Sequence, residues 1–273
     1  MKNESRRDEP DTADDPREEP AEPAPPACVL SFNANDPSGA GGLAGDVATI
    51  TAMGGHPLTV VTAVLMRDTA EIFDQLALDE DQLQPYQDAY RELILPATEV
   101  LVGNLKTLTD LLLPDWDSER PASARELAVA AGDRGTRYVL VTGIALPARG
   151  STPYVDNVLA SPQGAITGEK FERFDTAFVG SGETLSAALA SLLAAGSELQ
   201  AAVGEALAFL DQSLDAGFRP GMGGVVPDRF FWALPAAGEG EEPEGPEGLP
   251  LEPDNEQEPA ARAQEQETKR RVH

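Results

Sequence analysis

The sequence predicts an α/β fold in which a largely parallel sheet is layered with helices. Three observations lead to this prediction. Strand-like and helix-like segments alternate along the chain, the strand-like runs are almost wholly apolar, and glycine-rich turns join two of them to helices. The run at 58–65 is unbroken in apolar character, as is expected of a strand that is covered on both faces.

The folded domain is expected to span residues 27–235. Residues 1–26 and 236–273 are rich in Pro, Asp and Glu and contain little that could be buried. Such segments cannot offset the entropy of ordering, so both are predicted to be disordered acidic tails.

The expected elements follow one another in alternation. Strands are predicted at 28–34, 58–65, 98–104 and 136–144, with a hairpin at 154–174 around the turn at 162–164. Helices are predicted at 43–55, 79–95, 105–113, 122–135, 183–195 and 198–216.

Composition excludes several classes of function. The net charge of −27 argues against a nucleic-acid partner, because phosphate backbones require a basic surface. The sequence has no apolar run near 18 residues and no signal-peptide pattern, so no membrane segment is expected. The single cysteine cannot form an internal disulfide, which fits a cytoplasmic protein.

The turn Gly180-Ser181-Gly182-Glu183 precedes the apolar helix predicted at 183–195. Glycines at a helix start let a phosphate approach the unpaired N–H groups and the positive end of the dipole. An acid at that place can accept a proton from a hydroxyl group. The alternative is an ordinary helix start in which Ser181 is the cap and Glu183 favours the dipole. Spacing alone favours the ordinary start.

A second glycine-rich loop, Asn35–Asp46, also joins a strand to a helix. It lacks the Gly-Lys-Ser/Thr ending of a P-loop, so it either surrounds a small ligand or makes a tight turn. His56 is the only histidine of the predicted domain and is expected to be structural. The sequence has no His/Cys cluster of the zinc type and no Gly-x-Ser-x-Gly motif.

Four collinear segments together resemble a known family, the bacterial hydroxymethylpyrimidine/phosphomethylpyrimidine kinases of thiamine biosynthesis. The segments are "VLSFNANDPSGAGGLAGDVATITAMGGHPLTVVTAVLMRDT", "RELILPATEVLVGNLKTL", "GSGETLSAALASLL" and "AGFRPGMGGVVPDRFFWA". The resemblance implies a ribokinase-like three-layer α/β/α fold with a mostly parallel central sheet. It also implies transfer of the γ-phosphoryl group of ATP, with Mg²⁺, to a hydroxymethyl aminopyrimidine or its phosphate ester. A homodimer is a further expectation.

The resemblance assigns roles to three groups of residues and names no metal ligand. The catalytic group is Glu183 as the general base, with Gly180, Ser181 and Gly182 forming the anion hole. The substrate group is Asp36, Ser38, Gly39, Asp46 and Arg67, and the nucleotide group is Asn104, Thr142 and Gly143.

The chain departs from the family pattern in four places. Glu183 replaces a cysteine, Thr107 replaces the acid of an Asn-x-x-Glu motif that helps hold Mg²⁺, and Arg67 replaces a Gln or Glu that binds the pyrimidine. A strand–helix–strand stretch before "RELILP" is also missing, so the sheet is predicted to be short of two strands. These departures favour two alternatives to an active pyrimidine kinase. One is a non-catalytic relative that binds a pyrimidine, nucleotide or anion, or acts as an interaction protein; the other is a kinase with a different small-molecule substrate.

Overall fold

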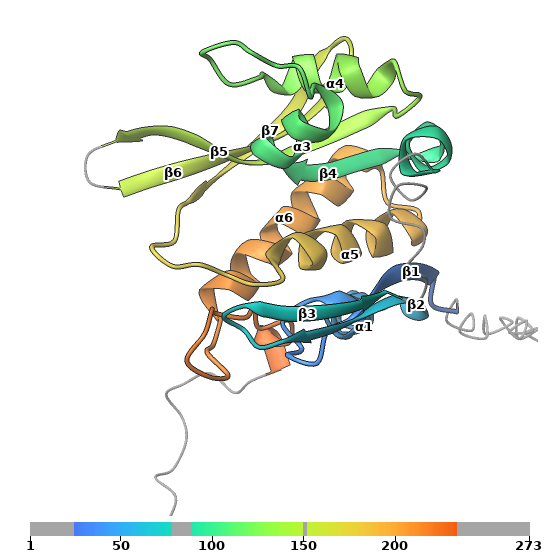
Figure 1. Cartoon of the computed structure of the whole chain (residues 1–273), viewed down its shortest axis with the longest axis vertical. Helices are drawn as coiled ribbons and strands as arrows, with labels where there is room; N and C mark the ends of the chain where they lie inside the picture. Colours follow the sequence, from blue (N-terminus) through green and yellow to red (C-terminus); the bar gives the residue numbers. More distant parts are fainter. Residues whose placement is uncertain (1–24, 78–88, 150–151, 234–273) are drawn as a thin grey trace, which may run out of the picture. The chain divides into compact units, whose positions relative to one another are not determined.

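The computed structural model describes residues 25–77, 89–149 and 152–233 (Figure 1). Most of both predicted acidic tails and most of the helix predicted at 79–95 lie outside these residues. The chain divides into one unit of residues 1–231 and a second of residues 232–273, and only Trp232 and Ala233 of the second are described. The predicted boundaries of the domain remain a prediction.

The first sheet, sheet A, has the strand order β1-β2-β3. It consists of β1 (Cys28–Asn35), β2 (His56–Arg67) and β3 (Ile72–Ala77). β1 and β2 are parallel, and β2 and β3 are antiparallel. The sequence prediction missed β3, in which acidic and polar residues interrupt the apolar pattern.

The second sheet, sheet B, has the order β4-β5-β6-β7. It consists of β4 (Val100–Asn104), β5 (Tyr138–Arg149), β6 (Thr152–Ser161) and β7 (Gly164–Glu172). β4 and β5 are parallel, whereas β5, β6 and β7 form an antiparallel meander that contains the predicted hairpin.

The helices confirm most of the predicted spans. They are α1 (Gly42–Ala52), α3 (Leu105–Leu112), α4 (Ala124–Gly132), α5 (Ser181–Ala194) and α6 (Leu199–Asp215). The described end of the predicted helix at 79–95 is a π-helical turn, Tyr90–Ile94, followed by a 3₁₀ turn, Leu95–Ala97. A last 3₁₀ turn spans Phe231–Ala233. Within the described parts of the chain, no helix is long and apolar enough to cross a membrane.

Sheet B is covered on both faces. On β5, Val139 and Val141 pack into a core with α3 and α4, while Leu140 between them packs against α5 and α6. All three side chains are fully buried. The apolar character of this strand therefore reflects burial on both of its faces.

Within the described residues, sheet A is covered on one face only. Val29 of β1 packs with Ile50 of α1 and Ala187 of α5. Its neighbours Leu30 and Phe32 point to the other face and are 54% and 65% exposed. The open face carries further exposed apolar side chains, such as Leu58 of β2, so the expectation that the strand at 58–65 is covered on both faces is wrong.

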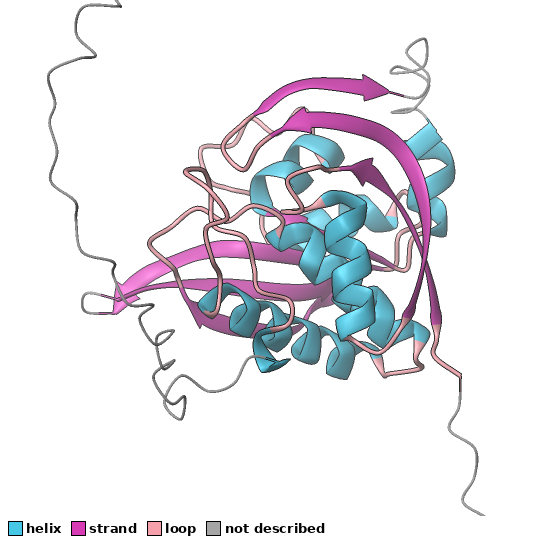
Figure 2. Cartoon of the chain, turned by 90° about the horizontal axis from the view of Figure 1, so that it is seen from below, coloured by secondary structure: helices cyan, strands magenta, loops and turns pink. Residues whose placement is uncertain are grey.

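The α/β class is confirmed, but the prediction of one mostly parallel central sheet is wrong in detail. Only two of the five strand pairings are parallel, and the strands form two sheets. The division falls between β1 and β4; the sequence analysis expected two strands to be missing before residue 91 but did not say which strands would then be neighbours. In the described part of the chain the facing edges of β1 and β4 are not paired, and α5 packs against both strands. Figure 2 shows the two sets of strands standing apart with helices between them.

Candidate active site

Helix α5 begins at a glycine with a left-handed backbone. Gly180 is the N-cap, with φ of +86°, and no side chain caps the helix. Among the described residues, the N–H groups of Ser181, Gly182 and Glu183 have no hydrogen-bond acceptor. The reading of Ser181 as an ordinary cap is therefore wrong, because Ser181 is the first residue inside the helix. The start of α5 leaves three donors and the positive end of a dipole open to an anion.

The loop of residues 36–42 before α1, here called the α1 loop, is folded around Asp36. The Asp36 carboxylate is buried and accepts hydrogen bonds from Ser38 N (2.9 Å), Ser38 Oγ (2.6 Å) and Gly41 N (3.2 Å). Arg67 Nη1 lies 3.7 Å from Asp36 Oδ2, the oxygen that also accepts from Gly41 N. Asp36 is thus occupied in shaping the loop rather than open to a ligand.

The α1 loop packs directly on residues 180–183, here called the α5 turn. A Cβ added at Gly180 would lie 1.7 Å from the carbonyl oxygen of Ala40. A Cβ added at Gly41 would lie 2.9 Å from Glu183 Oε1. Glycine is required at Gly180, where φ is positive and backbone meets backbone, whereas a side chain at Gly41 would displace the Glu183 carboxylate. Within the described residues the Glu183 carboxylate accepts no hydrogen bond and forms no ion pair.

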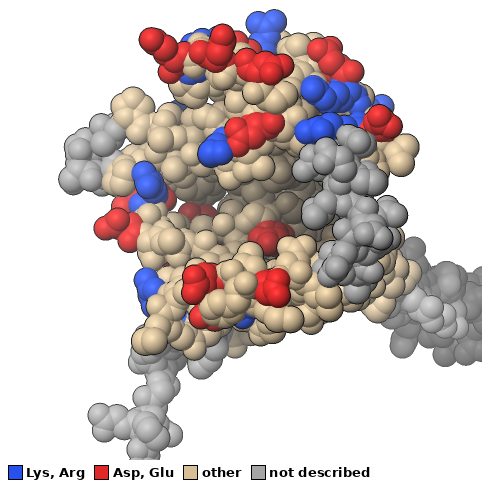
Figure 3. Space-filling model, in the orientation of Figure 1, with Lys and Arg blue, Asp and Glu red and all other residues tan. Residues whose placement is uncertain are grey.

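A cavity of about 840 Å³ lies between β1, β4 and the start of α5. In Figure 3 this face of the protein is hollowed between the two sheets, with acidic atoms inside the hollow. Six of the residues predicted for the site line the cavity: Asp46, Asn104, Thr142, Ser181, Gly182 and Glu183. The Asp46 carboxylate accepts hydrogen bonds from Ser31 Oγ (2.5 Å) and Asn33 Nδ2 (3.0 Å).

A second cavity, of about 350 Å³, meets the first at Thr142 and Ser181. Its walls are largely apolar and include Phe171, Phe174 and Leu207. Gly143, with φ of +67°, lies at its edge and donates its N–H to Asn157 Oδ1 at 3.0 Å. The second cavity therefore places a largely apolar slot beside the α5 turn.

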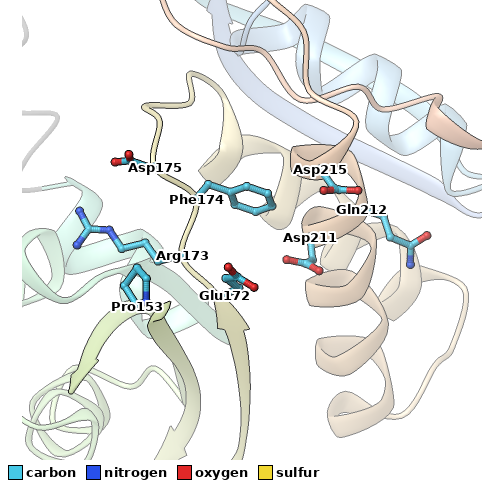
Figure 4. A pocket seen from close by; sticks show the side chains of 8 residues that line it. All are labelled: Pro153, Glu172, Arg173, Phe174, Asp175, Asp211, Gln212 and Asp215. Carbon is cyan, nitrogen blue, oxygen red and sulfur yellow. The ribbon is translucent and has the colours of Figure 1, made fainter. Parts of the chain in front are cut away.

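A third cavity, of about 970 Å³, lies apart from the predicted site residues. Figure 4 shows it between the end of β7 and α6, with the ring of Phe174 directed toward α6 and Arg173 turned away from it. Its acidic side chains are Glu172, Asp175, Asp211 and Asp215. Burial and the charge of Asp215 raise the pKa of Asp211. None of the site residues predicted from the sequence lines this cavity.

Not every predicted residue reaches a cavity. Asp36, Ser38, Gly39 and Arg67 line none of the three. Arg67 donates Nε–H to the Asp68 carbonyl at 2.9 Å and pairs with Asp36. Asn104 lines the first cavity, but its Oδ1 caps α3 by accepting from Thr107 N at 2.9 Å.

The sequence analysis missed Arg229. This arginine is 5% exposed and donates hydrogen bonds to the Ala40 carbonyl (2.6 Å) and to Thr184 Oγ1 (3.1 Å). Burial lowers the pKa of Arg229, while the charges of Glu183, Asp46 and Asp36 act in the opposite direction. The only signal in the sequence is a lone cation in the apolar run "VVPDRFF".

The side chains of the first cavity do not fit a magnesium ion held by the protein alone. No group of three or more His, Cys, Asp or Glu side chains in the described residues is placed to hold a metal. Asp46 is already bound to Ser31 and Asn33, and Thr107 on the cavity wall is neutral. No step below is therefore assigned to a metal.

Comparison with solved structures shows the fold. The chain resembles the ADP complex of Bacillus subtilis pyridoxal kinase with a TM-score of 0.62 and 19% identity, covering 77% of this chain and 99% of the other. It resembles a putative phosphomethylpyrimidine kinase from Bacteroides thetaiotaomicron with a TM-score of 0.57 and 15% identity, covering 80% and 97%. The fold is therefore the ribokinase-like α/β fold.

The sequence comparisons show the family. The model of the phosphomethylpyrimidine kinase family matches residues 83–228, more than half of the 273-residue chain. This chain belongs to the phosphomethylpyrimidine kinase family. It is 24% identical over 240 residues to the thiamine biosynthesis multifunctional protein ThiED of Corynebacterium efficiens, with 68% of this chain covered. The match spans about a third (32%) of that longer relative.

Proposed function

We propose that the chain transfers the γ-phosphoryl group of ATP to the hydroxymethyl group of an aminopyrimidine, or to the phosphate ester of that compound, in thiamine biosynthesis. The observation that carries the proposal is the start of α5. Three N–H groups without acceptors and the unpaired carboxylate of Glu183 meet there at the wall of one cavity. Family membership supports the same reaction.

The reaction follows from this geometry. The substrate oxygen attacks the γ-phosphorus, its proton passes to the Glu183 carboxylate, and the bond from phosphorus to the leaving ADP oxygen breaks. The N–H groups of Ser181, Gly182 and Glu183 stabilise the negative charge on the transferred group. Such a site works mainly by positioning and charge stabilisation, which the rigid contact between the α1 loop and the α5 turn supplies.

Each of the two adjoining cavities is suited to one of the two substrates. The apolar slot beside Thr142 and Gly143 is suited to the nucleotide base. The larger cavity beside Asp46 is suited to the pyrimidine, because the Asp46 carboxylate can accept from an amino group as well as from Ser31 and Asn33. Asp36, Ser38 and Gly39 act by holding the α1 loop in shape, with Arg67 balancing the charge of Asp36. A divalent ion would arrive bound to the nucleotide phosphates.

A second candidate is binding of the same ligands without turnover. Thr107 favours it, because a neutral hydroxyl stands on the cavity wall where the resembling kinases carry an acid. The unpaired edges of β1 and β4 also leave this cavity wider than a continuous sheet would. For both candidates we propose small-molecule ligands and a cytoplasmic location; the homodimer remains a prediction.

The test measures binding and turnover on one preparation. Calorimetric titrations with Mg·ATP and with hydroxymethylpyrimidine are followed by an ADP-release assay, using wild type, Glu183→Gln and the matched control Glu205→Gln. Glu205 is an exposed acid on α6, away from the cavities. Pyrimidine-dependent ADP release that falls about 100-fold or more in Glu183→Gln alone supports the kinase.

The other outcomes are equally decisive. Binding of both ligands without ADP release favours the non-catalytic relative, and Thr107→Glu is then expected to begin turnover. An unchanged rate in Glu183→Gln contradicts the role of Glu183 as the base. If the protein binds neither ligand, both candidates are wrong.

A further inference from the structure

Arg229 lies one residue beyond the region that the family model matches, and the reaction described above does not use it. Its guanidinium group joins the two loops of the site. Nη2 donates to the carbonyl oxygen of Ala40 in the α1 loop at 2.6 Å. Nε donates to Thr184 Oγ1 at 3.1 Å, and that hydroxyl donates to the carbonyl oxygen of Gly180 in the α5 turn at 2.8 Å. One side chain thus connects loops that lie about 140 residues apart in the sequence.

The backbone is built to admit this side chain. A Cβ added at Gly45 of α1, or at Gly180, would in each case lie 2.9 Å from Arg229 Nη2. Real Cβ atoms essentially never come that close to such an atom. Glycine at both positions therefore lets the planar guanidinium group lie against the main chain of both elements, which a bulkier pair of residues would prevent.

The charges around Arg229 agree with this arrangement. The side chain is buried, and three carboxylates, those of Glu183, Asp46 and Asp36, act on it. A buried guanidinium group stays protonated, so it offsets part of the negative charge that these acids place at the site. Without that cation, an incoming phosphate at the α5 turn would face the acids with only Arg67 to balance them.

The backbone on the N-terminal side of Arg229 is held from several directions. Asp228 donates its N–H to the Ser213 carbonyl of α6 at 2.9 Å. Val225 donates to the Ala177 carbonyl at 3.2 Å, and Gly224 donates to the Thr69 carbonyl at 2.9 Å. This C-terminal segment therefore delivers Arg229 to the junction of the two loops in a defined position.

We propose that Arg229 is a positioning residue that locks the α1 loop against the α5 turn and so keeps the three N–H donors of the α5 turn ready to bind an anion. The locking contacts stand by themselves; only the identity of the bound anion as a phosphoryl group rests on the proposed function. Arg229 touches neither the nucleotide nor the pyrimidine in this account, because it reaches the site through Ala40 and Thr184.

The test compares Arg229→Met and Arg229→Lys with a matched control, Arg219→Met. Arg219 lies on the same segment and donates to a backbone carbonyl, that of Gly223, at 2.6 Å, but it is exposed. Amide hydrogen exchange is followed by NMR at Gly41 and Thr184, which donate to Asp36 Oδ2 and to the Gly180 carbonyl. Leu127 of α4 is the reference amide, and binding of inorganic phosphate is titrated in parallel.

We expect Arg229→Met to speed exchange at Gly41 and Thr184 by tenfold or more relative to Leu127, and to weaken phosphate binding by tenfold or more. Arg229→Lys should change amide exchange and phosphate binding less than Arg229→Met does, because its ammonium group keeps the charge and a donor atom. Arg219→Met should change neither. If the protein is catalytically active, Arg229→Met should lower kcat by a larger factor than it raises KM. The reason is that the lock acts on the anion hole rather than on either substrate.

Three results would overturn the proposal: unchanged exchange at Gly41 and Thr184, a uniform rise that includes Leu127, or equal effects in Arg219→Met. If the wild type shows no turnover but Arg229→Met speeds exchange at Gly41 and Thr184 alone, the proposed function is contradicted. The role of Arg229 in holding the two loops together is then still supported. If Arg229→Met does not fold, Thr184→Val replaces it. That variant keeps the shape but removes the acceptor for Nε, so unchanged exchange at Gly41 and Thr184 would again overturn the lock.

Discussion

The starts of α4 and α5 differ in which groups, if any, accept hydrogen bonds from the N–H groups of the first helical turn. At α4, Ser123 Oγ accepts from Glu126 N, and the Glu126 carboxylate accepts from Ser123 N at 2.9 Å. Arg120 then binds that carboxylate through two hydrogen bonds of 2.8 and 2.6 Å. This is a complete capping box, and it stabilises the helix locally.

At α5 the same groups are left without partners. The N-cap is Gly180, which has no side chain to accept a hydrogen bond, and the acid of the first turn, Glu183, does not fold back onto the N-cap. Instead the turn is held from outside, by Ala40 and by Arg229 through Thr184. Stability at α4 comes from the first turn itself, whereas at α5 it comes from tertiary contacts that leave the donors free.

The other helices extend the comparison. α3 and α6 are capped by the side chains of Asn104 and Glu198, while α1, like α5, has no side-chain cap. The two uncapped starts are the two that meet beside Glu183. An uncapped start costs stability, so its occurrence at this junction is best explained by a ligand that supplies the missing acceptors.

The largest predicted effect separates the two glycines of the α5 turn. Gly180→Ala requires a residue with φ of +86° whose Cβ would lie 1.7 Å from the Ala40 carbonyl. We expect it to lower the free energy of unfolding by about 3 kcal/mol or more and to abolish phosphate binding. Urea denaturation and phosphate titration measure both.

Gly182→Ala is the matched control for stability. A Cβ at Gly182 would meet nothing within 4 Å, and the residue lies inside the helix. Alanine there is expected to raise the free energy of unfolding by up to about 1 kcal/mol. Similar losses of stability in both variants would contradict the picture of a turn held by contact with Ala40.

A smaller effect is expected at the serines of the two helix starts, Ser123 at α4 and Ser181 at α5. Ser123→Ala removes the cap of α4 and is expected to cost about 1 kcal/mol of unfolding free energy, with no change in phosphate binding. Ser181→Ala should change the unfolding free energy by less than about 0.5 kcal/mol, because the Ser181 hydroxyl caps nothing among the described residues. Thermal and urea denaturation of both variants test this. A loss at Ser181 as large as that at Ser123 would show that the serine is a cap after all.

The sequence predicts the elements well because their causes are local. The apolar run at 58–65 correctly predicted the strand β2, but the expectation that both of its faces are covered is wrong, because Leu58, Val60 and Val61 are exposed among the described residues. The helix spans were predicted from periodicity and from turn residues. β3 was missed because its exposed, mixed residues carry no such pattern.

The site was only partly predictable, because its geometry depends on distant segments. The glycines of both loops were found, but nothing local shows that Gly180 meets Ala40 or that Arg229 lies between them. Arg67 was expected in the substrate group and instead pairs with Asp36, a contact that requires β2 to lie beside the α1 loop. The missing segment predicted a sheet short of two strands, but neither the place of the break nor the two-sheet arrangement was predicted.

The smallest predicted effect concerns the pKa of Glu126, the acid of the capping box at α4. Hydrogen bonds from Arg120 and then from Ser123 hold the pKa of Glu126 far below its ordinary value of 4.5. Because the pKa is lower in the folded state, the ionised group stabilises the fold above pH 4.5, and this stabilisation is lost as the pH falls below that value. Glu126→Gln should therefore lower the urea midpoint at pH 7, and its difference from wild type should shrink steadily between pH 5 and pH 3. Arg120→Met should show the same convergence, because it removes the guanidinium group that holds this pKa down. A difference at Glu126 that stays constant between pH 5 and pH 3 would contradict the closed capping box at α4, and the contrast between the two helices would fail.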